Sequence, residues 1–246
     1  MARSTSTSKG GARPRAVGGA RPRAVAAGDR KAGAPAAPAR VAAIGSAARG
    51  RDRRRATVER TTRETSIAID LVLDGAGKSE IATGVPFLDH MLELFAKHGF
   101  FDLRVEAKGD LEVDAHHTVE DVGLTLGLAF RDALGSKEGI RRFGQSSVPL
   151  DEALVSVVVD LSGRPYFVYE LEAGQERVGT FDTGLVHDFL LAFVNELKMN
   201  LHVDCIRGRN PHHMIEAAFK GLARALDHAT SLDPRVTGVL STKGAL

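Results

Sequence analysis

The sequence predicts an α+β protein made of two tandem β-β-α-β-α repeats, related by a pseudo-two-fold axis within the chain. Each repeat is expected to form a half-sandwich, with a sheet of about four strands and helices on one face. Two observations predict this fold. Strand-like and helix-like periodicities alternate in the same order twice, and histidine motifs recur at equivalent points of both halves.

The charge distribution separates a tail from this repeated domain. Residues 1–55 hold 14 of the 33 Lys and Arg residues and two acids, a net charge of +12, whereas residues 56–246 carry a net charge of −10. The tail contains GGARPRAV twice in tandem, at 10–17 and 18–25, and lacks large apolar side chains, so we expect it to be disordered. An inert extension, an organelle transit peptide and a polyanion-binding tether remain open as its role.

Composition also excludes several classes of protein. No apolar run approaches 18 residues, which excludes a membrane span. The single cysteine, Cys205, excludes a disulfide framework and a cysteine-based zinc finger. The tail has no aromatic residues on which bases would stack, so no nucleic-acid partner is required. We expect a cytoplasmic protein, with organelle import through the basic tail as the alternative.

The first repeat is expected over about 57–146. Thr57–Leu73 partly alternates polar and apolar residues and predicts a strand, and a turn and a short strand near 79–83 follow. Pro86 opens a helix at Phe87–Lys97, capped by Gly99, because its apolar residues recur at helical spacing. A strand at Leu103–Ala107 and a helix at His117–Leu134, ending at Gly135, complete the repeat.

The second repeat, expected over about 147–244, follows the same order. The pattern predicts a β-branched strand, its partner after a turn, an apolar helix, a strand and a closing helix. These segments are Ala153–Leu161, Tyr166–Leu171, Leu185–Lys198, Leu201–Ile206 and His212–Thr230.

Six of the nine histidines occupy equivalent positions in the two repeats. One stands early in the first helix of each repeat, and an HHxxE motif opens the second helix. The residues are His90, His116, His117 and Glu120 in the first repeat, and His187, His212, His213 and Glu216 in the second. A single helix-opening His-His would be typical of a solvated cap, but the duplication indicates metal binding. His98, His202 and His228 have no such counterpart and are expected to be structural or surface residues.

Helix geometry indicates how these groups would act. A glutamate three or four residues after a histidine shares its helix face. Adjacent histidines diverge by about 100°, so each pair would serve two metal centres. Mixed imidazole and carboxylate ligation suits Mn, Fe or Zn, and the residues alone do not choose among them. The ligands could meet within one subunit or across a subunit contact.

Basic and hydroxyl residues in glycine-containing turns are candidates for an anion site. They lie in Arg141-Arg142, Ser162–Pro165, Arg207-Gly208-Arg209 and Ser241–Gly244. Arginine offers a bidentate fork to phosphate, although each cluster alone is more typical of surface salt bridges. Glu64, in the first strand, is a further candidate for a polar contact.

These motifs together resemble the imidazoleglycerol-phosphate dehydratase family. The likeness covers about residues 57–244 and includes ERTTRETSIAIDLVLDG, TGVPFLDHMLELFAKHGFFDL, DAHHTVEDVGLTLG, DLSGRPY, RNPHHMIEAAFKGLARAL and STKG. The resemblance implies metal-dependent dehydration of imidazole glycerol phosphate to imidazole acetol phosphate in histidine biosynthesis. It also implies a 24-subunit shell and two Mn²⁺ ions in each active site, formed where subunits meet.

The resemblance assigns roles to residues by their numbers in this sequence. The metal ligands implied are His90, His116, His117, Glu120, His187, His212, His213 and Glu216. The substrate-binding residues implied are Glu64, His90, His116, His117, Arg142, Arg164, His212, Ser241 and Lys243. A metal would provide the electron sink that loss of an unactivated C–H proton needs. Glu64, Glu120 or Glu216 would move the protons, and the sequence does not decide which.

Two other functions compete with this interpretation. A dinuclear metallohydrolase acting on a phosphorylated or anionic small molecule would use the same ligands to activate water. A non-enzymatic protein that buffers metal or binds polyanions would need the histidines or the tail but no phosphate pocket. The clustered basic turns therefore favour an enzyme with a small phosphorylated substrate.

Overall fold

The computed structural model describes residues 54–172, 174 and 176–246. Most of the basic tail, including its tandem duplication, lies outside the described residues. Arg55, the last residue assigned to the tail, begins the first strand, and the Arg54 guanidinium donates hydrogen bonds to Asp74 at 2.6 and 2.9 Å. In the described part of the chain, no helix is both long and apolar enough to cross a membrane.

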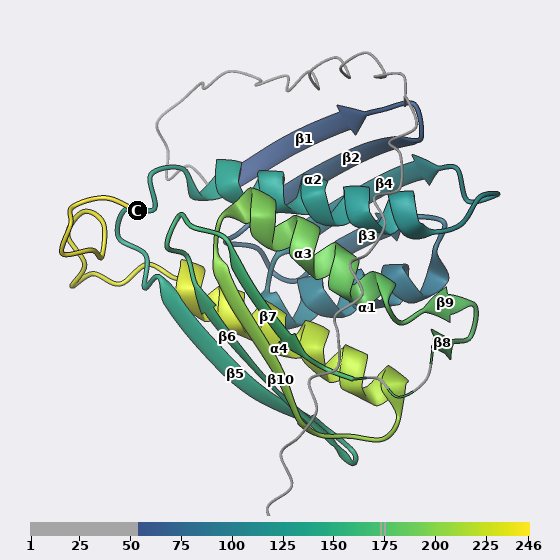
Figure 1. Ribbon diagram of the computed structural model, residues 1–246. Helices are drawn as coiled ribbons and strands as arrows, with labels where there is room; N and C mark the ends of the chain where they lie inside the picture. Colours follow the sequence, from purple (N-terminus) through teal and green to yellow (C-terminus); the bar gives the residue numbers. More distant parts are fainter. Residues whose placement is uncertain (1–53, 173, 175) are drawn as a thin grey trace, which may run out of the picture. The chain divides into compact units, whose positions relative to one another are not determined.

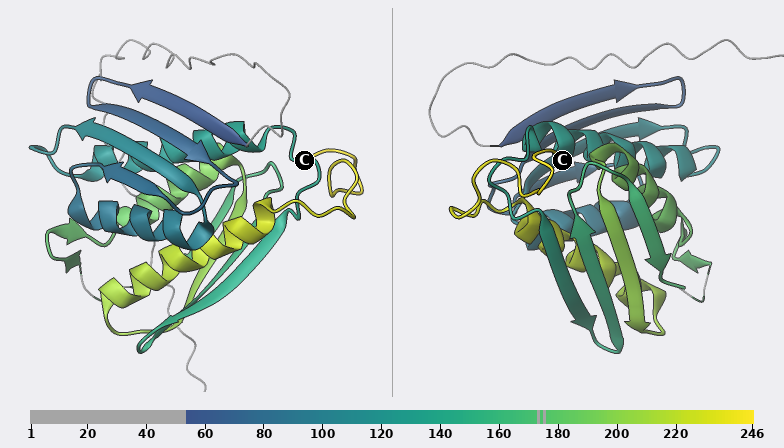
Figure 2. Two further views of the ribbon diagram at one scale, coloured as in Figure 1. Left: turned by 180° about the vertical axis from the view of Figure 1, so that it is seen from behind. Right: turned by 60° about the vertical axis from the view of Figure 1, so that its left-hand side comes forward.

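Two four-stranded sheets enclose two pairs of helices (Figures 1 and 2). The first repeat supplies β1 (Arg55–Thr61), β2 (Thr65–Val72), β3 (Ser79–Ala82), α1 (Pro86–Gly99), β4 (Asp102–Gly109) and α2 (His116–Leu134). The second supplies β5 (Phe143–Leu150), β6 (Ala153–Asp160), β7 (Tyr166–Glu170), α3 (Leu185–Leu197), β10 (Asn200–Arg207) and α4 (Pro211–Thr230). A small hairpin, β8 (Arg177–Val178) and β9 (Phe181–Asp182), precedes α3.

The two sheets have the same topology, which confirms the predicted α+β repeat. Their strand orders are β1-β2-β4-β3 and β5-β6-β10-β7. In the first sheet β2 pairs antiparallel with β1 and with β4, and β3 pairs parallel to β4. In the second sheet β6 pairs antiparallel with β5 and with β10, and β7 pairs parallel to β10. Each repeat is therefore β-β-β-α-β-α, with one strand more than the β-β-α-β-α order predicted.

Two of the strand predictions were wrong in detail. The single strand expected at 57–73 is the hairpin β1–β2, because the Thr62 hydroxyl accepts hydrogen bonds from the N–H groups of Glu64 and Thr65 and turns the chain. Strand β5 was missed because it contains Gly144 and Pro149, which weaken a strand pattern. Proline is tolerated there because β5 is an edge strand. It also runs across the repeat boundary expected at 146/147.

The four helices were predicted to within two residues at each end. At the end of α1, however, the left-handed residue is Phe100, with φ of 56°, and Gly99 is the last helical residue rather than the cap. Helix α2 ends before Gly135, at φ of 54°, as expected.

The core lies between the sheets and joins the two repeats. Buried phenylalanines from α1, α2 and α3 contact one another, with ring centroids 5.8 Å apart for Phe95–Phe130 and 5.5 Å for Phe130–Phe193. Helices α2 and α3 approach closely at Gly123, where a Cβ atom would come within 2.4 Å of the Phe189 carbonyl oxygen. This packing fixes the starts of the helices relative to one another, and the histidines lie there.

Candidate metal and substrate site

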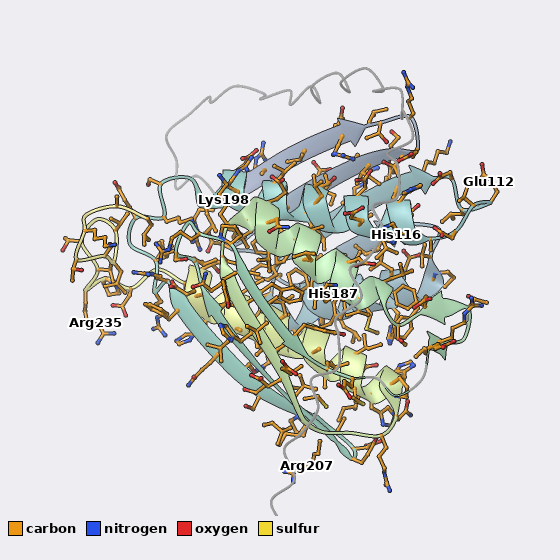
Figure 3. All side chains as sticks on the ribbon, viewed as in Figure 1. Glu112, His116, His187, Lys198, Arg207 and Arg235 are labelled. Carbon is orange, nitrogen blue, oxygen red and sulfur yellow. The ribbon has the colours of Figure 1, made fainter. Side chains whose placement is uncertain are left out.

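The repeated histidines lie at the N-terminal ends of the four helices. His187 is in the first turn of α3, His90 is the fifth residue of α1, and each histidine pair lies at the start of α2 or α4. These helix starts converge, because Phe87 of α1 contacts His212 of α4 (5.3 Å between ring centroids) and His116 of α2 lies 3.4 Å from Asp188 of α3. Figure 3 shows His116 and His187 on this side of the molecule.

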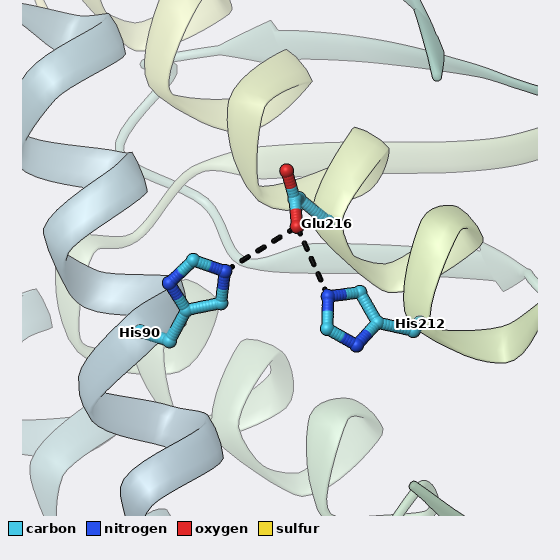
Figure 4. A group of neighbouring side chains, drawn as sticks. All are labelled: His90, His212 and Glu216. Atoms are coloured by element: carbon cyan, nitrogen blue, oxygen red, sulfur yellow. Dashed lines mark hydrogen bonds and ion pairs between the residues drawn. The ribbon is translucent and has the colours of Figure 1, made fainter. Parts of the chain in front are cut away.

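His90, His212 and Glu216 form the α1/α4 cluster (Figure 4). Glu216 Oε2 lies 3.4 Å from His90 Nε2 and 3.1 Å from His212 Nε2. One ligand atom from each of the three residues lies within 4.8 Å of the others. Two imidazoles and a carboxylate converging in this way fit a divalent transition-metal ion.

The environment of Glu216 favours the ionised carboxylate. Burial alone would raise the pKa of Glu216, but the hydrogen bond and charge of Lys220 and the hydrogen bonds to His212 and His90 bring it below its ordinary value. Lys220 Nζ lies 2.6 Å from the second carboxylate oxygen, Oε1. The oxygen nearer the histidines therefore carries negative charge suited to a cation.

His116, Glu120 and His187, here called the α2/α3 cluster, are the counterparts of the first cluster in the other helix pair. Among the described residues only the α1/α4 cluster brings three ligand atoms within 4.8 Å of one another. His116 Nε2 lies 3.8 Å from Glu120 Oε2, at i,i+4 spacing. Asp188 connects the two histidines, at 3.4 Å from His116 Nδ1 and 3.4 Å from His187 Nδ1. Asp188 was not a sequence candidate, because a carboxylate next to a histidine on a helix gives no periodic signal.

The second histidine of each pair faces away from its own cluster, as expected for adjacent helical residues. His117 Nδ1 lies 3.0 Å from Asp110, and His213 Nδ1 lies 2.8 Å from Glu152. These hydrogen bonds raise the pKa of His117 and of His213 above the ordinary value. The structure thus does not bring His117 or His213 into the cluster of the same helix pair, and the second ring nitrogen of His213, Nε2, lies 3.9 Å from the exposed carboxylate of Asp151.

Glu64 lies beside His117 on the turn between β1 and β2. Its carboxylate is 3.9 Å from His117 Nδ1, and its side chain is 57% exposed. The turn is fixed to α2 through Asp121, which accepts a hydrogen bond from the Thr65 hydroxyl and lies 2.5 Å from Arg60 Nη1. Glu64 is therefore held by its backbone while its carboxylate stays accessible.

A basic cavity of about 620 Å³ is lined by the predicted anion-binding residues Arg142, Arg164, Ser241 and Lys243. The Arg142 guanidinium donates to both oxygens of Asp160, at 2.6 and 3.0 Å, and to the Leu240 carbonyl at 2.8 Å. Arg235 also lines the cavity and was missed, because its position depends on the fold of the C-terminal segment. Arg209 lies instead at the histidine end, beside Glu152.

The basic cavity and the histidines lie at opposite ends of the helices. Arg142 N–H donates to the carbonyl of Ala229, which comes 17 residues after His212 on α4. At about 1.5 Å per helical residue, the two ends are separated by about 25 Å. In Figure 3, Arg235 is accordingly far from His116 and His187.

The fold and the site together define an α+β protein with histidine and carboxylate side chains gathered at one end of its helices and a separate cavity lined by basic residues. The sequence pattern of imidazoleglycerol-phosphate dehydratase matches residues 83–226. The chain is 58% identical over 193 residues to the imidazoleglycerol-phosphate dehydratase of Geobacter metallireducens, covering 78% of this chain and 99% of the relative. The enzyme of Geobacillus sp. strain WCH70 is 61% identical over the same length and coverage.

Solved structures give the same result. The imidazoleglycerol-phosphate dehydratase of Staphylococcus aureus superposes with a TM-score of 0.66 at 41% identity, over 72% of this chain and 98% of that chain. The enzyme of Pyrococcus furiosus, in complex with (S)-C348, gives 0.68 at 40% identity, over 77% and 100%.

The chain belongs to the imidazoleglycerol-phosphate dehydratase family. It is therefore a hydro-lyase that dehydrates imidazole glycerol phosphate in histidine biosynthesis. This assignment selects the dehydratase over the metallohydrolase and the non-enzymatic alternatives.

Proposed function

We propose that this dehydratase works with two divalent metal ions in each active site, Mn²⁺ being the ion implied by the family resemblance. The convergence of His90, His212 and Glu216 carries this proposal, because their ligand atoms lie within 4.8 Å of one another. The full proposed ligand set adds the α2/α3 cluster and the second histidine of each pair. It comprises His90, His116, His117, Glu120, His187, His212, His213 and Glu216.

The metal would supply an electron sink next to the carbon that loses its proton. The chain's own residues position the substrate and move the protons. Of the three candidate carboxylates, Glu216 is occupied by Lys220, His212 and His90, and Glu120 faces His116. Glu64 is the most exposed of the three, beside the ring of His117. This favours Glu64 as the group that takes the proton from carbon.

The phosphate of the substrate would bind in the basic cavity. Arg142 is held in place by the Asp160 carboxylate. Arg164, Ser241 and Lys243 line the same cavity and add charge and hydroxyl donors. A fixed guanidinium loses little side-chain freedom when it binds an anion, which favours affinity.

One subunit does not bring these parts together. A three-carbon chain between a ring and a phosphate reaches only about 10 Å at roughly 1.5 Å per bond. The two ends of the helices are separated by about 25 Å. We therefore propose that the histidine end of one subunit and the basic cavity of another form each active site, within a closed homo-oligomer. The resemblance implies 24 subunits, and we propose a cytoplasmic location.

The experiment that tests the proposal measures turnover and metal content together. Protein stripped of metal by a chelator should lose activity and regain it with Mn²⁺, in step with metal bound by elemental analysis. His90→Gln should weaken metal binding by at least the roughly 10–100-fold seen when a supporting group is lost. His98→Gln is the matched control on the same helix, outside the cluster. Full activity after exhaustive metal removal would overturn the proposal.

A further inference from the structure

The two repeats carry equivalent carboxylates on equivalent turns. Glu64 directly precedes β2 on the turn that follows β1, and Glu152 directly precedes β6 on the turn that follows β5. Each faces the second histidine of a pair, His117 or His213. Symmetry alone would therefore give the two glutamates the same role.

Their contacts are different. Glu152 Oε2 lies 2.8 Å from His213 Nδ1, whereas the Glu64 carboxylate is 3.9 Å from His117 Nδ1. The other Glu152 oxygen, Oε1, accepts hydrogen bonds from the backbone N–H groups of Arg209 and Asn210, at 3.1 and 2.7 Å. The side chain of Glu152 is 26% exposed, against 57% for Glu64. Both oxygens of Glu152 are thus engaged.

The residue after the glycine that ends β4, or follows β10, explains this difference. Gly109 and Gly208 are equivalent, because a Cβ atom at either would clash with the residue after the second histidine, Thr118 or Met214. Asp110 follows Gly109, and its carboxylate holds His117 Nδ1 at 3.0 Å. Arg209 follows Gly208, and an arginine side chain offers no acceptor. Glu152 supplies from the turn what Asp110 supplies from the strand end.

We propose that Glu152 is a positioning residue that keeps the proton of His213 on Nδ1 and leaves Nε2 free to bind metal. At the equivalent position in the first repeat, Asp110 holds His117 Nδ1 instead, so the Glu64 carboxylate is available to take a proton from the substrate. The inference rests on the proposed role of His213 as a ligand. Carboxylates that hold the outer nitrogen of a ligating histidine orient the ring and fix its tautomer.

Glu152→Gln tests the inference because an amide has only one acceptor oxygen. If that oxygen keeps the backbone N–H groups, the amide NH₂ faces His213 Nδ1 and drives the proton to Nε2. We expect Mn²⁺ affinity, measured by chelator competition, to fall by about 10–100-fold. Glu64→Gln, the change at the equivalent turn, should keep the wild-type affinity while turnover falls.

A double-mutant cycle separates positioning from a general structural effect. If Glu152 acts through His213, Glu152→Gln combined with His213→Gln should bind Mn²⁺ no more weakly than His213→Gln alone. Solid-state ¹⁵N NMR of the metal-free, histidine-labelled protein should show the His213 proton moving from Nδ1 to Nε2 in Glu152→Gln. Additive losses, or an unchanged tautomer, would overturn the inference. Wild-type affinity in His213→Gln would instead contradict the ligand role of His213.

Discussion

At the scale of single residues, each histidine pair divides its two rings between different neighbours. His212 faces His90 and Glu216, and His213 faces Glu152. Helix geometry predicted this divergence. It left open whether each glutamate pairs with the first or the second histidine, and the structure pairs the first, His116 with Glu120 and His212 with Glu216. The sequence alone therefore predicts that the two histidines of each pair point in different directions, because this depends only on local helix geometry.

The carboxylates that contact the second histidine of each pair could not be predicted in the same way. Glu152 is 61 residues before His213, and only the pairing of β5, β6 and α4 brings them together. Asp110 and Asp188 lie near histidines in the sequence, but acidic residues on loops and exposed helix faces are common. Contacts across elements depend on the fold, which periodicity alone does not give.

Asp121 is expected to affect turnover indirectly, by positioning Glu64. It holds both Arg60 and Thr65, which flank the turn that carries Glu64. We expect Asp121→Asn to lower kcat by about 10–100-fold, because a small displacement of a reacting group is costly, while KM and Mn²⁺ affinity stay near wild type. Steady-state kinetics and metal titration measure these quantities. Asp132→Asn, on the same helix and partly exposed, is the control. An unchanged kcat in Asp121→Asn would contradict the positioning of Glu64 by this contact.

At the scale of elements, the helices followed from the sequence more completely than the strands. Buried Leu88, Met91, Leu92 and Phe95 lie on one face of α1, as their spacing predicts. The β1–β2 turn depends on hydrogen bonds to the Thr62 hydroxyl, which leave no mark in hydrophobic periodicity. Strand β5 is recognisable only from its pairing with β6. A strand is defined by hydrogen bonds to neighbouring strands, whereas an amphipathic helix can be recognised from the periodicity of its own residues.

The Asp233 carboxylate is one of the groups that hold the C-terminal segment lining the basic cavity. Asp233 accepts hydrogen bonds from Arg235 at 2.6–3.0 Å, and its own N–H donates to Gly139. The side-chain and backbone hydrogen bonds of Arg235 lower the pKa of Asp233 below its ordinary value of 3.8. A lowered folded-state pKa stabilises the fold above the unfolded value, and this contribution is lost as the pH falls through the folded value.

The prediction is that Asp233→Asn lowers the free energy of unfolding near neutral pH, and that the difference from wild type shrinks as the pH falls below about 3.8. Urea unfolding across that pH range measures it. Glu80→Gln, which removes an exposed carboxylate on β3, should show no such convergence. A difference that grows toward low pH would contradict the role of the Asp233 charge.

At the scale of the whole molecule, the repeat places all the proposed metal ligands at one end and the proposed anion-binding groups at the other. The sequence predicted both sets but not their separation. Helices of 19 and 20 residues, α2 and α4, begin at the histidines, and the basic cavity forms beyond their far ends. Because both helix pairs start at the same end, no turn of the chain brings the two sets together. This separation is the reason for the proposal that each substrate molecule bridges two subunits.

Mixing two inactive variants tests this bridging. Glu64→Gln disables the histidine end and Lys243→Gln the basic cavity, so neither homo-oligomer should be active. In a randomly co-assembled mixture of equal parts, each site that draws its two ends from different subunits has about one chance in four of receiving both intact ends. Activity should then recover to about a quarter of wild type. Mixing without dissociation and reassembly is the control. If both ends came from one subunit, co-assembly would restore nothing, since every subunit would carry one defect.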